Sequence, residues 1–327
     1  MMNSFYKLKS IKMSENTHNM LVSLGGNAIL KHTEKGTAKE QFENVDKTSR
    51  YIVELISEGY NIALTHGNGP QVGDILLAYD CAKEFLPPMP LDVCGAESQG
   101  MIGYMFQLSL KNILKEKQID KTVVTILTQT LIDPEDKALK NPSKPIGPFY
   151  TAMEAVKLRK EKNWIIEDDS GRGFRRLVPS PKPLGFVEAG CIKTLHDAGD
   201  LVIASGGGGI PVIQKDGVLN GVECVIDKDY AASELATLIE AQILLIITDV
   251  DKIALNYGKP QQKDLDRVNI SQANQYLNEG HFPAGSMGPK VKSAIKFLEN
   301  GGEKVVVTSL ENALDALKGK RGTIISP

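Results

Sequence analysis

Several features that would assign this chain to a familiar class are missing from its sequence. The four cysteines form no C-x-x-C pair, which argues against a zinc site and against a disulfide framework. The longest apolar runs fall far short of the roughly 20 residues that cross a bilayer. Residues 1–19 contain neither an apolar signal-peptide core nor a small-residue cleavage site. We therefore expect a cytoplasmic protein with no membrane partner and a disordered N-terminal extension over residues 1–19.

The chain also lacks a surplus of positive charge. Its 38 Lys and Arg residues are outnumbered by 40 Asp and Glu residues, which gives a net charge of -2 at pH 7. A protein that holds nucleic acid usually needs a basic field to neutralise the phosphates. This balance favours a small-molecule partner and argues against nucleic acid.

Common catalytic motifs are absent as well. There is no G-x-x-x-x-G-K-[ST] loop, no G-x-G-x-x-G fingerprint and no H-R-D or D-F-G triplet, so a P-loop enzyme and an ordinary protein kinase are excluded. No G-x-S-x-G elbow supports a serine hydrolase. The five histidines never fall at metal-ligand spacing.

What the chain does contain is an alternation of short apolar runs with amphipathic segments of helical length. This pattern predicts an α/β fold whose mainly parallel sheet is covered by helices on both faces. The predicted core strands are residues 20–24, 61–65, 122–127, 201–204, 243–248 and 304–308. The predicted helices are residues 38–57, 70–84, 96–116, 231–241 and 289–298. Asp216-Gly217 between two apolar runs predicts a hairpin turn.

Three predicted strands run directly into glycine-rich turns. These are Gly25-Gly26-Asn27, Gly67-Asn68-Gly69 and the four glycines of residues 206–209. Ligands of open α/β sheets bind beyond the carboxyl ends of the strands, and glycine lets backbone N–H groups approach phosphate oxygens. Any one turn could be only a tight connection, but three at one edge predict an anion-binding cradle.

Lysines near such turns are the next candidates, because phosphoryl transfer depends on positive charge around the migrating group. Lys144, Lys228 and Lys290 qualify. Each of them alone could equally be a solvated surface residue. Lys228 is the most distinctive, since the aspartates on either side of it could orient its ammonium group or hold magnesium.

Residues 129–183 interrupt the alternation with seven prolines and little periodicity. A long irregular insertion in a compact domain is usually a functional loop, unless it is disordered. Its four large aromatic residues favour an ordered structure. We predict a folded lid subdomain, called here the lid segment, inserted into a domain that spans residues 20–327.

The motifs, taken in order, resemble the signatures of the amino acid kinase family, and within it those of the carbamate kinases. The resemblance extends from about Met20 to the C-terminus. It is carried by Gly25-Gly26-Asn27, residues 67–73 (GNGPQVG), residues 141–150 (NPSKPIGPFY), Gly171-Arg172-Gly173, residues 225–229 (VIDKD) and residues 285–290 (GSMGPK). Asn27 is the sharpest discriminator, because related acetylglutamate and glutamate kinases typically carry lysine just after the paired glycines.

The resemblance implies a three-layer α/β/α sandwich with a mainly parallel sheet of about eight strands, a protruding lid and a homodimer. It implies reversible phosphoryl transfer between ATP and carbamate, giving ADP and carbamoyl phosphate, with Mg²⁺ as cofactor and with ATP synthesis in arginine fermentation as the expected direction. Catalytic roles would fall to Lys144, Lys228, Asp229 and Lys290. Carbamate and the phosphoryl group would be held by Gly25, Gly26, Asn27, Gly67, Asn68 and Gly69. The nucleotide would be held by Gly207, Gly208, Thr248, Asp249, Tyr257 and Met287.

Two alternatives stay open at this point, and the magnesium ligands are unassigned. One is another small-acid or nucleotide kinase of the same fold, which a lysine in place of Asn27 would have favoured. The other is a non-catalytic nucleotide-binding sensor, which the loss of Lys228 or Asp229 would have favoured.

Overall fold

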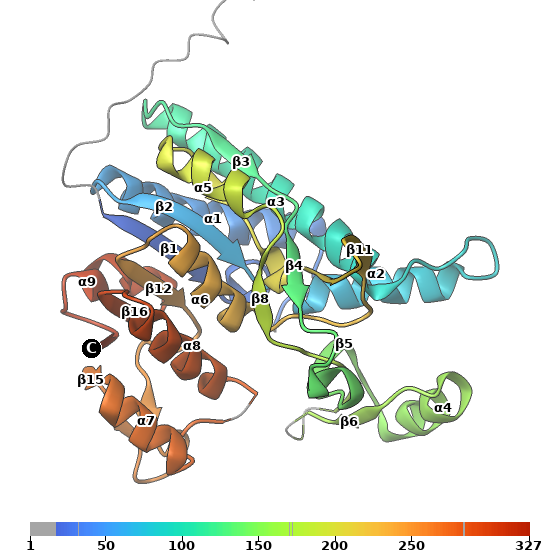
Figure 1. Ribbon diagram of the computed structural model, residues 1–327. Coiled ribbons are helices and arrows are strands. Elements are labelled where there is room, and N and C mark those ends of the chain that lie inside the picture. The colour runs from blue at the N-terminus through green and yellow to red at the C-terminus, as the bar shows by residue number, and fades with distance from the viewer. Residues whose placement is uncertain (1–17, 32, 170, 172, 284) are drawn as a thin grey trace, which may run out of the picture.

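The computed structural model describes residues 18–31, 33–169, 171, 173–283 and 285–327. Most of the predicted N-terminal extension, residues 1–17, therefore lies outside the described residues, as does Arg172 of the predicted 171–173 motif. The described chain folds around one large twisted sheet with helices packed on both of its faces (Figure 1).

The main sheet has eight strands in the order β15-β17-β16-β12-β1-β2-β9-β3. All of its pairs are parallel except β16 with β17. The strands are β1 (Asn19–Leu24), β2 (Asn61–His66), β3 (Val123–Thr125), β9 (Leu201–Ile203), β12 (Ile243–Ile247), β15 (Arg267–Asn269), β16 (Lys304–Thr308) and β17 (Thr323–Ser326). The six predicted strands all belong to this sheet, which confirms the predicted three-layer architecture.

Alternation along the central strands explains the two helical layers. In β1, Met20, Val22 and Leu24 point to one core, whereas Leu21 points to the other. A strand buried on both faces is mostly apolar, which is why these strands look like near-continuous apolar runs. One face is covered by α1 (Ala38–Ser57), α3 (Leu91–Glu116) and α9 (Ala313–Leu317). The other face is covered by α5 (Ala189–Asp197), α6 (Lys228–Leu238), α7 (Ile270–Asn278) and α8 (Met287–Glu299).

Smaller sheets extend from the carboxyl side of the main sheet. The predicted hairpin is confirmed: β10 (Ile210–Lys215) pairs antiparallel with β11 (Val218–Gly221) through Asp216 and Gly217, both at positive φ. These strands form a four-stranded sheet with β4 (Gln129–Ile132) and β8 (Pro183–Phe186). A further pair joins β13 (Ala254–Leu255) to β14 (Lys263–Asp264).

The middle of the lid segment, residues 137–178, forms a small unit of its own, whereas β4 and Pro183 at its two ends belong to the four-stranded sheet. It contains η2 (Lys137–Lys140), β5 (Lys144–Tyr150), α4 (Ala152–Lys162), β6 (Ile166–Asp168) and β7 (Phe174–Val178), with β5, β7 and β6 in one three-stranded sheet. Figure 1 shows α4 and β6 projecting from the body. The unit packs on α2 (Gly69–Ala82), where a Cβ added to Gly73 would lie only 2.2 Å from Gly147 Cα. The two backbones therefore touch at a point where only glycine fits on α2.

Three helices begin two or more residues earlier than the sequence pattern predicts, and α2 begins one residue earlier. Helix α3 starts at Leu91 instead of residue 96, with Pro90 as its N-cap and Asp92 in its first turn. Helix α6 starts at Lys228 instead of residue 231, because the Asp227 side chain caps it. Helix α8 starts at Met287, two residues before the predicted position. Residues at a helix N-cap and in the first turn are often polar or proline and do not follow the helical spacing of apolar residues. A prediction from apolar spacing alone therefore places the start of the helix too late.

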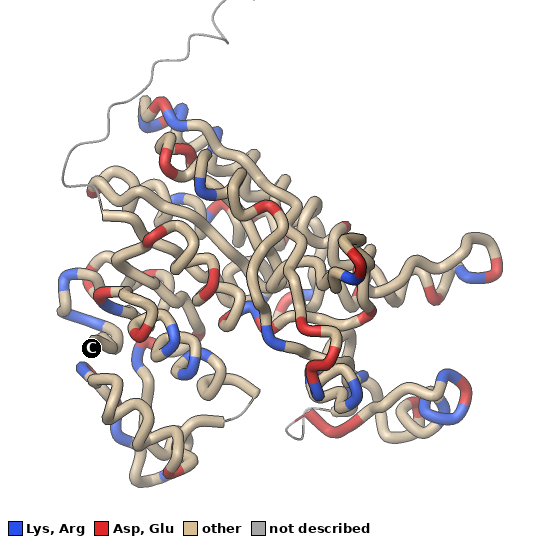
Figure 2. The backbone as a smooth tube through the Cα atoms, viewed as in Figure 1, with Lys and Arg blue, Asp and Glu red and all other residues tan. Residues whose placement is uncertain are grey.

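Charged residues of both signs are interspersed over the described fold (Figure 2). None of the helices formed by the described residues is long and apolar enough to span a bilayer.

Candidate active site

The first two glycine turns meet at the carboxyl ends of the central strands. The Gly67 N–H donates to Leu24 O at 3.1 Å, and the Gly25 N–H donates to Ile247 O at 2.9 Å. A Cβ added to Gly67 would lie 3.5 Å from both Gly26 N and the Cδ of Lys228. The structure thus brings the turns after β1 and β2 together with the lysine at the start of α6.

The third turn, η3 (Gly206–Gly208), packs against the second. Gly207 has φ +67°, and a Cβ there would lie 2.1 Å from Asn68 Nδ2. A Cβ on Gly208 would lie 2.5 Å from Ile226 O. Glycine is required at both positions, because neighbouring atoms leave no room for a Cβ and because the backbone has a positive φ.

Asn68 connects the turn to a helix N-terminus. It is the N-cap of α2, but its side chain makes no capping bond and instead donates to Ser98 Oγ at 2.8 Å. Gly69 is the first residue of the helix and Pro70 follows it. The first N–H groups of a helix have no partner within the helix and favour anions. Gly67, Asn68 and Gly69, three of the residues predicted to hold carbamate, therefore lie at a helix N-terminus.

A cluster of buried charges faces these turns. Lys228 Nζ lies 2.6 Å from Asp229 Oδ1, and Lys290 Nζ lies 3.1 Å from Asp229 Oδ2. Lys228 also donates to Ser23 Oγ on β1 at 3.3 Å. Asp229 is 4% exposed, so one carboxylate holds two ammonium groups in a site that largely excludes water. The cluster keeps a net positive charge.

The protonation of this cluster follows from burial and from charge. Burial raises the pKa of the Asp229 carboxyl, but the ammonium groups of Lys228 and Lys290 outweigh this effect and hold the pKa far below its usual range. Burial also lowers the pKa of Lys228, an effect that Asp229 opposes. Asp229 is therefore an anion at neutral pH and fixes both lysines in place.

The lid contributes the third predicted lysine. Lys144 is the first residue of β5, and its Nζ lies 2.5 Å from Asp227 Oδ2. Asp227 in turn accepts the Asp229 N–H at 2.9 Å, so it caps α6 and receives the lid lysine with the same side chain. All four predicted catalytic residues thus lie around the N-terminus of α6.

Sequence reasoning missed two polar partners in this site and one role of a third. Asp227 was expected only to orient Lys228 or to hold magnesium, although an aspartate directly before an amphipathic segment is also a helix N-cap candidate. Ser23 interrupts an otherwise apolar strand, which marks a polar contact on that face. Ser98 lies inside α3, far along the chain from Asn68, and no local pattern links the two.

The six residues predicted to bind nucleotide do not form one group. Thr248 and Asp249 follow β12 and line a cavity that also contacts Gly25 and Asn27. Met287 begins α8 and packs against the core beneath that helix. Tyr257 is 59% exposed, and no hydrogen bond, ion pair or ring contact joins it to another described residue. The adenine position therefore remains a prediction.

No group of three or more His, Cys, Asp or Glu side chains among the described residues is arranged to hold a metal ion. Asp227 and Asp229 flank Lys228, whose side chain lies beside Gly67, and both already bind lysine. This donor set suits a magnesium ion that arrives on nucleotide phosphates, because Mg²⁺ commonly binds one or two carboxylates plus substrate oxygens.

Comparison with known proteins gives a consistent result. The profile of the amino acid kinase family matches residues 20–309. The chain is 51% identical to the carbamate kinase of Pyrococcus horikoshii, over 94% of this chain and 99% of that protein. It is 52% identical to the carbamate kinase of Thermococcus kodakarensis, over 93% of this chain and 98% of that protein.

A solved structure agrees with these relatives. The carbamate kinase of Giardia lamblia bound to AMP-PNP superposes with a TM-score of 0.88 at 46% identity, covering 95% of this chain and 99% of that one. The profile match alone spans most of the described domain, and the relatives match nearly from end to end. The chain belongs to the amino acid kinase family.

Proposed function

We propose that this protein is a carbamate kinase, which transfers a phosphoryl group reversibly between ATP and carbamate. The observation that carries the proposal is the Lys228–Asp229–Lys290 cluster placed against Gly26 and Gly67. Relatives at about half identity over nearly the whole chain carry the name carbamate kinase. An ATP analogue in the Giardia lamblia structure supports ATP and ADP as the nucleotides.

The reaction requires the protein to position the substrates and to stabilise charge, and it requires no general base. Carbamate is an anion at neutral pH, so its oxygen attacks the γ-phosphorus without losing a proton. The bond from that phosphorus to the bridging oxygen of ADP breaks, and ADP leaves. Lys228 and Lys290 stabilise the charge on the transferring group, and Asp229 positions them. The free N–H groups at the start of α2 offer further donors to the anion.

His66 lies beside these turns without adding charge. It ends β2, is 1% exposed, and its Nδ1 lies 3.0 Å from Gly67 O. Burial lowers the pKa of His66 to about 4, and the nearby Lys228 acts in the same direction. The ring is therefore neutral at pH 7 and acts as a packing partner of the glycine turn.

The lid has a proposed role in excluding water. Carbamoyl phosphate, an acyl phosphate, is labile in water, so a cover over the site protects it. Lys144 enters the site only through the lid, and its contact with Asp227 supports a lid that closes over the phosphoryl group. Mg²⁺ would be held between nucleotide phosphates and the carboxylates of Asp227 and Asp229, and would neutralise part of the phosphate charge.

We further propose a cytoplasmic homodimer that works toward ATP synthesis. Strand β3 is an edge of the main sheet, so one side of it has no strand partner, although the Thr125 N–H donates to Gln107 Oε1 at 3.2 Å. Beside it, Tyr104, Leu108 and Leu127 are exposed by 59%, 42% and 53%. An edge strand flanked by exposed apolar side chains favours pairing with a second copy.

A coupled assay tests the main proposal. Carbamoyl phosphate and MgADP are supplied, and ATP is read out. The reverse assay compares carbamate with acetate, N-acetylglutamate, glutamate, aspartate and UMP at equal concentration. We expect carbamate to be turned over fastest, with weak turnover of acetate at most. Faster turnover of N-acetylglutamate or UMP would reject the proposal.

A further inference from the structure

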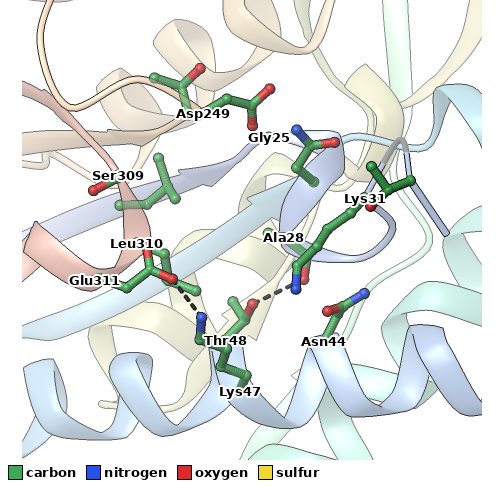
Figure 3. Close-up of a pocket in the computed structure, with 14 residues that line it drawn as sticks. Gly25, Ala28, Lys31, Asn44, Lys47, Thr48, Asp249, Ser309, Leu310 and Glu311 are labelled. Carbon is green, nitrogen blue, oxygen red and sulfur yellow. Dashed lines mark hydrogen bonds and ion pairs between the residues drawn. The ribbon is translucent and has the colours of Figure 1, made fainter.

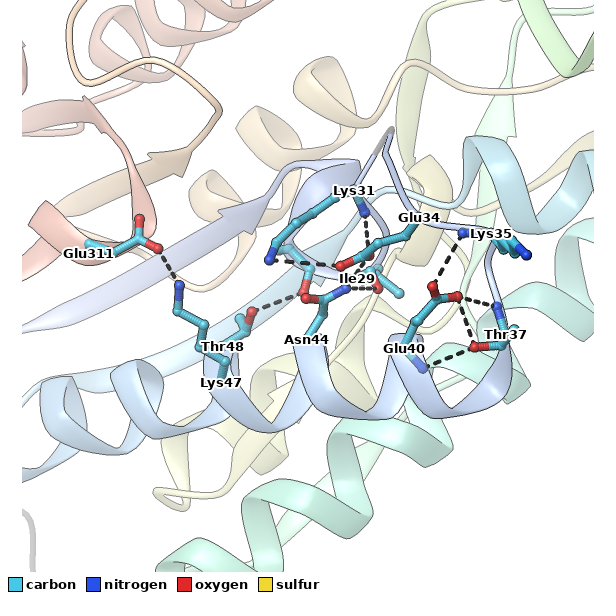
Figure 4. A network of polar contacts seen from close by, with 11 residues as sticks. Ile29, Lys31, Glu34, Lys35, Thr37, Glu40, Asn44, Lys47, Thr48 and Glu311 are labelled. Carbon is cyan, nitrogen blue, oxygen red and sulfur yellow. Dashed lines mark hydrogen bonds and ion pairs between the residues drawn. The ribbon is translucent and has the colours of Figure 1, made fainter.

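The backbone at the first glycine turn is held by polar side chains of a helix. Thr48 on α1 donates to Ala28 O at 2.9 Å (Figure 4). Asn44 on the same helix donates to Ile29 O at 3.2 Å. The polar cavity beside this turn, with a volume of about 340 Å³, is part of the proposed site, because residues predicted to hold acceptor and nucleotide line it (Figure 3). A turn at the site is thus positioned through its carbonyl groups.

The third glycine turn needs more support, because its backbone is unusual. Ser205, directly before the turn, is buried and has φ +53°, a left-handed conformation that disfavours residues with a Cβ. Gly207, Gly208 and Gly209 follow with φ between +67° and +97°. A segment of this kind keeps a single conformation only where the surrounding structure fixes it.

Buried side chains fix the carbonyl groups of this turn. Three carbonyl oxygens of residues 205–208 each accept a hydrogen bond from a different element of the fold, namely β2, α3 and β4. The bonds run from Thr65 Oγ1 to Ser205 O at 2.9 Å, from Gln99 Nε2 to Gly206 O at 3.1 Å, and from Thr130 Oγ1 to Gly208 O at 2.8 Å. The carbonyl side of the turn is therefore held from three directions.

The N–H groups of Gly206 and Gly207 are left for a ligand. Neither of them donates to another group within the part of the chain that the structure describes. Successive N–H groups in such a turn form a concave binding site for an anion. Gly207 also packs against Asn68, the N-cap of α2. Two free donors therefore lie beside a helix N-terminus that itself favours anions.

Gln99 makes the largest number of these supporting contacts. It is 2% exposed, and besides Gly206 O its Nε2 donates to Thr128 O at 3.2 Å. Its Oε1 accepts the Thr128 N–H at 2.9 Å. Thr128 Oγ1 in turn accepts the Ser205 N–H at 2.8 Å. Gln99 thus holds the turn both directly and through Thr128, and both N–H groups of its amide are already used.

We propose that Gln99 is a positioning residue for phosphoryl transfer, which holds the third glycine turn so that the N–H groups of Gly206 and Gly207 meet the transferring group. One peptide unit carries both Gly206 O and the Gly207 N–H. Without the amide of Gln99 this peptide could rotate, and an oxygen would then replace a donor next to the phosphoryl oxygens. The effect on catalysis rests on the proposed function, whereas the effect on the turn does not.

Gln99→Met tests this role, because methionine has a similar size but no N–H donor. With carbamoyl phosphate and MgADP, kcat should fall roughly 10-fold to 100-fold, as for other small displacements of positioned groups. The KM for MgADP should stay within about threefold of the parent value, because the two N–H groups act on the transferring group. Gln107→Met is the matched control, since Gln107 lies on the same helix and accepts the Thr125 N–H at 3.2 Å.

Two further measurements separate positioning from a general loss of stability. Leu110→Ala removes a buried side chain farther along α3, and it should lower the melting temperature with little change in kcat. Crystal structures of the parent and of Gln99→Met show the peptide between Gly206 and Gly207 without any need for turnover. We expect this peptide to be rotated in Gln99→Met and unmoved in Gln107→Met.

Three outcomes would overturn the proposal. The first is a folded Gln99→Met protein with kcat within about threefold of the parent value. The second is a decrease in kcat no larger than that of Leu110→Ala. The third is an unmoved peptide between Gly206 and Gly207 in the Gln99→Met structure. A parent protein that does not turn over carbamoyl phosphate would refute the proposed function instead, and the crystal structures would still decide whether Gln99 holds the turn.

Discussion

At the scale of single residues, Asp229 is the centre of the candidate site. Its carboxylate holds two ammonium groups together in a buried place where they would otherwise repel each other, and in the proposed mechanism this is its main contribution. Without that carboxylate, two adjacent buried lysines would be costly, and one of them would lose its proton or turn away. The roles of Lys228 and Lys290 therefore depend on a third residue.

Replacement of Lys228 tests the electrostatic mechanism. Lys228→Ala should lower kcat for carbamoyl phosphate roughly 100-fold to 1000-fold, the usual cost of removing one preorganised contact to developing charge. The KM for nucleotide should change less. Steady-state kinetics of Lys292→Ala, an exposed lysine on the same helix as Lys290, provides the control. A folded Lys228→Ala protein with near-normal kcat would show that the lysine is only a structural neighbour of the turns.

At the scale of elements, the lid and the body of the fold meet at several contacts, of which two have different functions. The glycine contact between α2 and β5 sets the distance between the two units. The Lys144–Asp227 contact is an ion pair between a lysine of the lid and an aspartate of the body. A third contact, the ion pair of Lys162 on α4 with Asp80 on α2, lies farther out. Each of the first two contacts can be removed without touching the main sheet.

Lys144→Ala should cut carbamoyl phosphate turnover at least tenfold while leaving MgATP affinity, measured without the second substrate, nearly unchanged. The reason is that Lys144 reaches the site only from the lid, and closure completes the positive clamp. The melting temperature should stay close to that of the parent protein, since Lys144 is one-third exposed. Unfolding of the variant, or unaltered turnover, would return the lid segment to a purely structural role.

Gly73→Ala tests the spacing of the two units. The added methyl group would meet the Gly147 backbone at 2.2 Å, so the lid strand has to shift away from α2. We expect kcat/KM for carbamoyl phosphate to fall on the order of 10-fold to 100-fold, as shifts near 1 Å in positioned groups often cause. Gly95→Ala on α3, where a Cβ meets nothing within 4 Å, should stay close to the parent value. Equal kinetics for the two variants would mean that the contact does not position the lid.

The same elements show what could be learned from sequence alone. Apolar runs predicted six strands, because strands buried on both faces are mostly apolar. The short strands β15 and β17 escaped prediction, since three or four residues with a mixture of buried and less buried side chains carry no clear period. Lys144 was a candidate from the sequence itself, but its catalytic role came only from the family resemblance. Its partner Asp227 is 83 residues away, and a contact of that range depends on how the lid folds back.

At the scale of the whole molecule, two buried histidines make stability depend on pH. His66 and His196 are almost fully buried, and burial lowers the pKa of each to about 4. The unfolded chain binds these protons near pH 6.5, so it gains protons first as the pH falls. The free energy of unfolding should be highest above about pH 6.5. It should decrease toward pH 4, by up to about 3 kcal/mol for each histidine.

Denaturant unfolding between pH 4 and pH 8 measures this decline. His196→Gln should lessen the slope, because His196 lies at the amino end of the sheet beside Asn61 and away from the glycine turns. Glutamine retains hydrogen-bonding capacity at that position but does not titrate. An unaltered slope in a folded variant would assign the acid sensitivity to the carboxylates instead.

The proposed dimer is tested by charge at the exposed edge. Tyr104→Glu combined with Leu108→Glu should convert the dimer to a monomer in light scattering, because like charges would face each other across a two-fold axis. Both residues lie on α3 with exposed side chains, so the monomer should still fold. Val218→Glu, at an exposed apolar residue on β11, serves as the control. A parent protein that is monomeric at micromolar concentration would refute the proposal.

The position of β1 in the middle of the sheet has a consequence for how the chain is made. One edge of β1 pairs with β2 soon after both are synthesised, but the other edge waits for β12, about 180 residues later. At ribosomal rates of roughly 5 to 20 residues per second, that wait lasts on the order of 10 to 40 seconds. An apolar strand edge remains open on the nascent chain throughout this time. Ribosome profiling combined with chaperone pull-down should find a chaperone bound to the nascent chain from the emergence of β2 until the emergence of β12.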